Sequence, residues 1–290
     1  MWAALFVMLL VVEVVQVAMS IAAALINPMV VMEEWFLLLA TFVSLHIIGL
    51  IVYYLMMKPK LPAVKREKKK MSLKDCIVLF FICMAATYLF NYVSLGINYL
   101  IGLLKHSPVA NPLDYAVGGN VVWQVFVIGI SAPVVEELIF RKFMLDFLRP
   151  YGDKTAIWVT ALAFAMFHGN LSQAFYAFAL GLIFAYIVIR TNDVRYSIAY
   201  HIIINILGST IIPMMALSGS SVLTTISGLL VILFILAGVI LFIMNVKKLV
   251  LEKGEIMLDK KERFRALYLN AGMVVYTIMC LIIFISILAV

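Results

Sequence analysis

Long apolar runs follow one another along almost the whole of this chain. Each holds about 20 residues, the length that an α-helix needs to cross the hydrocarbon core of a bilayer. Hydrophobic residues make up 66% of the sequence, more than a soluble domain could bury. The sequence therefore predicts an all-α polytopic transmembrane bundle. We draw nine spans, with eight as the alternative because the fifth is short: 2–25, 35–57, 76–104, 121–148, 155–169, 171–190, 196–217, 221–246 and 267–290.

The basic residues gather in a few places between these runs. The 58–75 linker holds eight Lys and Arg, the 141–154 segment four, the 190–195 turn two and the 247–266 linker seven, which is 21 of 22. All four places fall on one side of a nine-span chain. By the positive-inside rule this predicts a cytoplasmic N-terminus and two basic cytoplasmic linkers.

The same distribution bears on domains and partners. The net charge is +7, but no basic domain carries it, so we expect a lipid bilayer around the chain and no nucleic-acid partner. We predict one membrane domain over 1–290, placed as a multi-pass protein in the plasma membrane.

Three short polar patterns interrupt the apolar runs. The first is Glu136-Glu137-Leu-Ile-Phe-Arg141. Residues four apart in a helix share a face, so Glu137 and Arg141 are predicted to form a structural ion pair. Glu136 is turned by about 100° and can face another element. Pro133, one turn earlier, is expected to bend this helix and open a cavity beside Glu136.

The other two patterns supply imidazole and amide groups. Phe164 and His168 are four residues apart, as are His201 and Asn205. Ionisable groups at membrane depth are costly and usually serve a function. The remaining histidines, His46 and His106, have no such neighbours in the sequence, and we assign them no role.

Together these groups suit peptide-bond hydrolysis. Glu136 and His168 could hold and deprotonate a water, while His201 and Asn205 could stabilise the oxyanion. A divalent metal such as zinc, held by Glu136, His168 and His201, is the alternative. The HExxH pattern of common zinc proteases is absent, and Asn205 is a better donor than ligand, which favours the metal-free version.

The motifs EExxxR, FxxxH and HxxxN, in this order on successive spans, resemble those of the CPBP intramembrane proteases, also called the Abi family. This family includes CaaX prenyl endopeptidases and bacteriocin-processing enzymes. The flanking stretches APVVEELIFR at 132–141 and GLIFAYIVIRTNDVRYSIAYHIIIN at 181–205 are similar too. The resemblance covers about 121–217, the expected catalytic core.

The resemblance implies a helical bundle whose site is reached from the cytoplasmic half of the bilayer. It implies that Glu136 activates water, that His168 helps to hold it, and that His201 and Asn205 stabilise the oxyanion. It leaves metal dependence open. One departure is Lys142, where the family often has glycine; a long basic side chain there bears on substrate preference.

The sequence thus predicts an intramembrane endopeptidase. Its expected substrate is a membrane-associated peptide or protein, such as a signalling or bacteriocin-like precursor or a lipidated C-terminus. The alternative is a non-catalytic membrane partner of a sensor kinase, a toxin or a cell-wall enzyme. A proton-coupled carrier that uses Glu136 and the histidines as a relay is a third reading, disfavoured because the chain shows no internal repeat.

Overall fold

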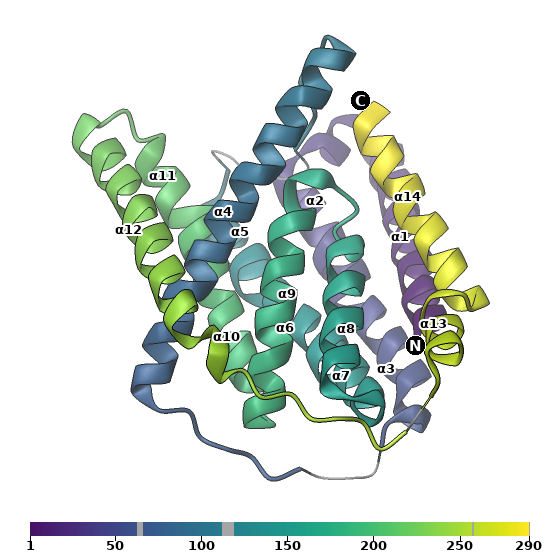
Figure 1. Ribbon diagram of the computed structural model, residues 1–290. Coiled ribbons are helices and arrows are strands. Elements are labelled where there is room, and N and C mark those ends of the chain that lie inside the picture. The colour runs from purple at the N-terminus through teal and green to yellow at the C-terminus, as the bar shows by residue number, and fades with distance from the viewer. Residues whose placement is uncertain (63–65, 112–118, 257, 290) are drawn as a thin grey trace.

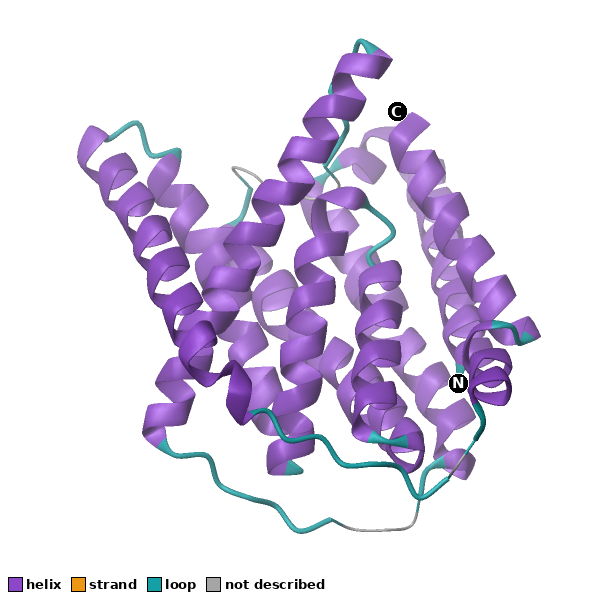
Figure 2. Ribbon diagram, in the orientation of Figure 1, coloured by secondary structure: helices purple, strands orange, loops and turns teal. Residues whose placement is uncertain are grey.

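The computed structural model describes residues 1–62, 66–111, 119–256 and 258–289. Within this part of the chain there are helices and loops and no strand, as Figure 2 shows. The elements are α1 (Trp2–Ile26), η1 (Pro28–Met32), α2 (Glu34–Thr41), η2 (Phe42–Gly49), α3 (Leu50–Met57), η3 (Lys58–Lys60), α4 (Leu73–Lys105), α5 (Val121–Gln124), η5 (Val125–Ser131), α6 (Ala132–Glu137), η6 (Leu138–Met144), α7 (Leu145–Leu148), η7 (Arg149–Tyr151), α8 (Asp153–Phe167), α9 (Leu171–Thr191), α10 (Val194–Asn205), η8 (Ile206–Ile211), α11 (Ile212–Ala216), α12 (Ser221–Asn245), η9 (Val246–Lys248), α13 (Lys260–Tyr268) and α14 (Ala271–Ala289).

Eight continuous helices in the described residues are long and apolar enough to cross a membrane, which confirms the predicted polytopic bundle. They run over Trp2–Ile26, Glu34–Lys60, Leu73–Lys105, Val121–Tyr151, Leu171–Thr191, Val194–Ala216, Ser221–Lys248 and Ala271–Ala289. The short fifth segment of the nine-span reading is α8, which has only 15 residues. At 1.5 Å per residue it is about 22 Å long, less than the roughly 30 Å of a hydrocarbon core.

The centre of the bundle is built on α8 and α9, which lie side by side in Figure 1. Their close approach depends on Gly181, where an added Cβ would lie 2.9 Å from the Ala161 Cα atom. Small residues at such a contact let two membrane helices pack backbone to backbone. The helix α4 packs on α9 and α12, while α1 packs on α14 and η2.

Four helical segments are π-helical, namely η2, η5, η6 and η8. They interrupt the second span, the Val121–Tyr151 span and the Val194–Ala216 span. A π-helical turn adds a residue and re-aims the side chains that follow it, and such turns are frequent at functional sites. The sequence pattern indicated helices here but not this change of helical type.

Both basic linkers lie along the same end of the bundle, the lower end in Figure 1, and the C-terminal end of α14 lies at the opposite end. This agrees with the clustering of basic residues found in the sequence. We refer to it below as the basic end. Which side of a membrane this end faces stays a prediction.

Candidate functional site

A buried ionic centre joins two of the three sequence patterns. Arg141 Nη1 lies 3.0 Å from Glu137 Oε1, and both side chains are fully buried. His201 Nδ1 lies 3.0 Å from the same oxygen and donates to it. One carboxylate therefore fixes its own helix and orients the imidazole of α10, as expected for a structural residue.

Aromatic rings enclose this centre. The Arg141 guanidinium carbon lies 4.1 Å from the Phe164 ring centroid and 5.5 Å from that of Phe184. A cation over an aromatic face is stabilised by the ring quadrupole, most strongly where water is excluded. The Phe164 ring also meets His168 edge-on at 4.8 Å and His201 at 5.8 Å. Phe164 thus contacts the charged pair and both histidines.

Glu136 is turned away from the ion pair and lines a small cavity. Its Oε2 atom lies 3.6 Å from His201 Nε2, and its side chain keeps 12% of its surface exposed. The cavity has a volume of about 170 Å³, room for a few waters at about 30 Å³ each. Besides Glu136, its polar lining comes from Thr41, His46, His168, Gln173, Tyr176, His201, Asn205 and Ser209. The structure thus gathers all four residues proposed as catalytic around one space.

His168 follows the last residue of α8 and is held by its own helix. Its Nδ1 atom lies 2.8 Å from the Phe164 carbonyl oxygen. A carbonyl can only accept a hydrogen bond, so Nδ1 carries a proton, and in the neutral ring Nε2 keeps its lone pair. The neutral ring therefore offers an acceptor, which suits the binding of a water.

Asn205 ends α10 and reaches across to the helix that carries Glu136. Its Nδ2 atom donates to the Ile128 carbonyl oxygen at 3.0 Å. In this π-helical stretch, residue i bonds residue i−5, as Ala132 does with Val127. Pro133 has no N–H, so the next carbonyl, that of Ile128, loses its helical donor. Asn205 replaces that donor and keeps one N–H of its amide.

His46 is a residue of the site that the sequence analysis missed. It lies in η2 on the second span, is only 5% exposed, and lines the same cavity as Glu136 and His168. Its Nδ1 atom lies 2.8 Å from Ser131 Oγ, on the helix that carries Glu136. The one signal in the sequence was its position inside an apolar span. The residues that it meets in the structure lie on other spans, so no local pattern marked it.

A second and much larger space adjoins the cavity. This cleft, of about 1110 Å³, is lined by the second half of α4, the first turns of α9, and the Asn205–Leu217 stretch. It shares five lining residues with the small cavity, namely Ile128, Gln173, Tyr176, Asn205 and Ser209. These elements place the cleft toward the end of the bundle opposite the basic end (Figure 1).

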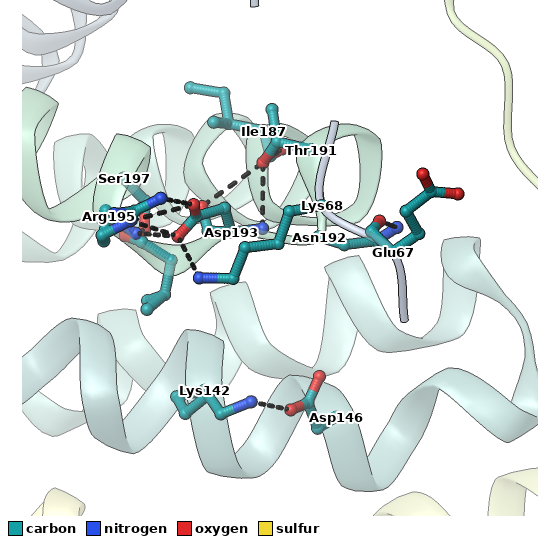
Figure 3. A network of polar contacts seen from close by, with 11 residues as sticks. Glu67, Lys68, Lys142, Asp146, Ile187, Thr191, Asn192, Asp193, Arg195 and Ser197 are labelled. Atoms are coloured by element: carbon teal, nitrogen blue, oxygen red, sulfur yellow. Dashed lines mark hydrogen bonds and ion pairs between the residues drawn. The ribbon is translucent and has the colours of Figure 1, made fainter. Parts of the chain in front are cut away.

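The basic end beneath the site is crossed by the first linker. Lys69 N donates to the Thr191 carbonyl. Figure 3 shows the ion pair of Lys68 with Asp193, in which Nζ lies 3.4 Å from Oδ1. Asp193 also accepts from the guanidinium of Arg195, whose hydrogen bonds lower the pKa of this carboxyl to about 2. The linker is therefore fastened to the α9–α10 turn by ionic and backbone contacts.

Lys142, the departure from the family pattern, lies at this end and not in the cavity. Its Nζ atom donates to Asp146 Oδ2 at 2.8 Å, and its side chain is 52% exposed (Figure 3). The long side chain is thus directed along its own helix to a carboxylate one turn later. Lys142 is not among the residues that line either space.

A metal site was the alternative use of these residues. Within the ranges that the structure describes, no three His, Cys, Asp or Glu side chains are grouped so that they could hold a metal ion. His201 Nδ1 and His168 Nδ1 are both engaged by protein oxygens, which leaves Nε2 as the ring nitrogen that each could offer to a metal. The residues as placed do not form the Glu-His-His set.

The fold and this site together define a polytopic helical membrane protein with a buried glutamate–histidine–asparagine centre. Residues 118–207 match the family model described as type II CAAX prenyl endopeptidase Rce1-like. This segment holds all three motifs and is just under a third of the chain. The match confirms the resemblance to the CPBP proteases, and the core is similar to a family of proteases. No curated protein and no solved structure matches the chain.

Proposed function

We propose that this protein is an intramembrane endopeptidase that hydrolyses a peptide bond with a water activated by Glu136. The observation that carries the proposal is the shared cavity, which brings Glu136, His168, His201 and Asn205 together from three different helices. The side chains of His201 and Glu136 are only 5% and 12% exposed, and electrostatic interactions are stronger between groups that are shielded from water.

Glu136 and the free Nε2 of His168 hold the attacking water between them. The carboxylate takes one proton of the water while His168 accepts a hydrogen bond from the other. A C–O bond forms between the water oxygen and the substrate carbonyl carbon. When the C–N bond breaks, Glu136 returns the proton to the leaving nitrogen, so the residue ends each turnover as it began.

Asn205 and His201 stabilise the oxyanion of the tetrahedral intermediate. Asn205 contributes the amide N–H that Ile128 does not use. His201 donates from Nε2 only when its ring carries two protons, because Nδ1–H is committed to Glu137. In that form Glu136, Glu137, Arg141 and His201 carry no net charge together, the arrangement least costly at membrane depth.

The substrate class follows from the setting and from the matched family. Glu136, His201 and Asn205 lie within candidate spans, so the scissile bond must reach them from a membrane-associated or lipidated peptide or protein. The family match is to prenyl endopeptidases, which makes a lipidated C-terminus one candidate. A bacteriocin-like or signalling precursor is another.

The test is a comparison of peptides from host cells that express the wild type or Glu136→Gln at equal membrane abundance. Peptides that appear only with the wild type would identify the scissile bond and support the mechanism.

Repeating the assay on purified protein with a chelator tests the metal, and the proposed mechanism predicts undiminished cleavage. If Glu136→Gln yields the same peptides, Glu136 is not the activating residue. If neither protein yields peptides and both give the same phenotype, a non-catalytic partner role replaces the protease.

A further inference from the structure

A polar stripe runs along one face of α4 inside an otherwise apolar span. Thr87, Asn91, Leu95, Asn98 and Gly102 are spaced by four, four, three and four residues and all line the large cleft. Residues at this spacing share one helical face. Two carboxamides on that face of a candidate membrane span are costly unless they are hydrogen-bonded.

The two asparagines of the stripe keep hydrogen-bonding capacity to spare. Asn98 Nδ2 donates to Ser172 Oγ at 2.9 Å, but its Oδ1 atom is shielded from solvent and has no partner. The Asn91 side chain, which is half-buried, makes no hydrogen bond with the part of the chain that the structure describes. Both side-chain amides can therefore form further hydrogen bonds with a molecule bound in the cleft.

The opposite walls complete a polar lining without formal charge. They include Ser172, Gln173, Tyr176, Asn205 and Ser209. Among the described lining residues there is no Asp, Glu, Lys or Arg. A carboxamide pairs with a peptide group in both directions, since each has one acceptor oxygen and an N–H donor. An extended backbone presents such groups at regular intervals, whereas a lipid chain presents none.

We propose that this cleft binds an extended, uncharged peptide segment of the substrate and leads it to Glu136. The proposal rests on the proposed proteolytic function, which it deepens by naming the substrate's chemistry and its path. The continuity of the two spaces through Gln173, Tyr176 and Asn205 supports the path. Charged side chains find no counter-ion along it and are excluded by the cost of desolvation.

The length of the stripe sets the number of residues bound. From Asn91 to Gly102 the helix rises by about 16 Å at 1.5 Å per residue. An extended peptide advances about 3.3 Å per residue, so roughly five substrate residues lie along the stripe. Asn91 and Asn98 are about 10 Å apart along the axis, which matches peptide groups three residues apart in the bound segment.

Photocrosslinking tests the proposal without relying on turnover. Benzoylphenylalanine is placed at Leu95, which lines the cleft, or at Val93, which is exposed on the same helix but does not line it. The probes are biotinylated hexapeptides of Ala, Val, Ser and Asn, and a matched set with Lys or Asp at every third position. The uncharged set should cross-link at Leu95 about tenfold more than at Val93, and the charged set should not.

Two substitutions sharpen the result. Asn91→Leu removes one amide and should weaken labelling by uncharged peptides by about three- to tenfold, the effect of one hydrogen bond. Asn98→Asp places a carboxylate in the cleft, so labelling at Leu95 should then favour the Lys-containing peptides of the charged set. Equal labelling at Leu95 and Val93, equal labelling by both sets, or cross-links to lipid alone would overturn the proposal. If cross-linking follows the expected pattern but wild type and Glu136→Gln give identical peptides in cells, the cleft binds peptides and the proteolytic function fails by itself.

Discussion

His201 Nδ1 lies 3.0 Å from Glu137 Oε1, the same oxygen that Arg141 approaches at 3.0 Å. This contact divides the work of two adjacent glutamates between structure and chemistry. Glu137 neutralises the buried Arg141 and fixes the ring of His201. Its second carboxylate oxygen, Oε2, is buried as well. Glu136, next in sequence but on another face, is left to meet whatever enters the cavity.

The two glutamates should therefore respond differently to the same substitution. Glu137→Gln leaves Arg141 buried without its counter-ion, a change that costs about 3–5 kcal/mol. We expect a large fall in the thermal unfolding temperature of the purified protein in detergent. Glu136→Gln is the matched control and should unfold near the wild-type temperature while losing cleavage. Similar unfolding temperatures for the two variants would contradict this division.

Asn205 and Pro133 should be energetically coupled through the Ile128 carbonyl. Asn205→Leu leaves that buried carbonyl unpaired and should cost about 1–3 kcal/mol of stability. Pro133→Ala restores a backbone N–H at the position that the π-helical pattern requires. In the double variant the loss from Asn205→Leu should shrink, with a coupling of about 0.5–3 kcal/mol in a double-mutant cycle. Additive effects of the two changes would mean that Asn205 does not serve this carbonyl.

His168 should affect the chemical step more than the fold. His168→Ala removes the acceptor for the attacking water, and the single-turnover rate should fall by about 10²–10⁴-fold. The unfolding temperature should change little, because the ring's one hydrogen bond to protein is to the carbonyl of its own helix. Lys74→Ala is the control, an exposed side chain in the first turn of α4 that lines neither the cavity nor the cleft. A His168→Ala enzyme as fast as this control would remove His168 from the mechanism.

The side from which the cleft opens can be measured in cells. If the basic end is cytoplasmic, as the positive-inside rule predicts, the cleft opens toward the exterior. His106→Cys at the cleft should then react with a membrane-impermeant maleimide in intact cells, in a background without Cys76. Lys74→Cys, exposed at the basic end, should react only after permeabilisation. The reverse pattern would place the cleft on the cytoplasmic side, the access that the family resemblance implies.

The linker contacts at the basic end should weaken in acid. The Arg195 guanidinium lowers the pKa of Asp193 from 3.8 to about 2. A lowered carboxyl pKa stabilises the fold fully above about pH 4, and this contribution is lost as the pH falls from 4 to 2. The protection factor of the Lys69 N–H, which donates to Thr191, should fall in that range, since this factor corrects for the intrinsic pH dependence of amide exchange. In Asp193→Asn the protection factor should already be reduced at neutral pH and should not fall further between pH 4 and 2.

Much of the fold was predictable because it depends on local composition. Runs of about 20 apolar residues indicate helices that cross a bilayer, and the structure confirms eight candidates in the described residues. The Glu137–Arg141 pair was predictable for the same reason, since both residues lie on one helix four positions apart. The hydrogen bond from Lys142 to Asp146 is equally local, since the two residues are four apart on one helix. The sequence analysis considered the length and charge of the Lys142 side chain but not Asp146 as its partner.

The sequence by itself determined the class of protein, the spans and the chemical groups available, because hydropathy and helical spacing are properties of single segments. Only the tertiary structure decided which groups meet. His46 joins the cavity, Asn205 pairs with Ile128, and the α4 stripe faces a cleft because several helices pack at particular rotations and depths. Those rotations depend on contacts such as Gly181 against Ala161 and on the π-helical turns. Such contacts join residues far apart in the chain, and the pattern within one segment does not encode them.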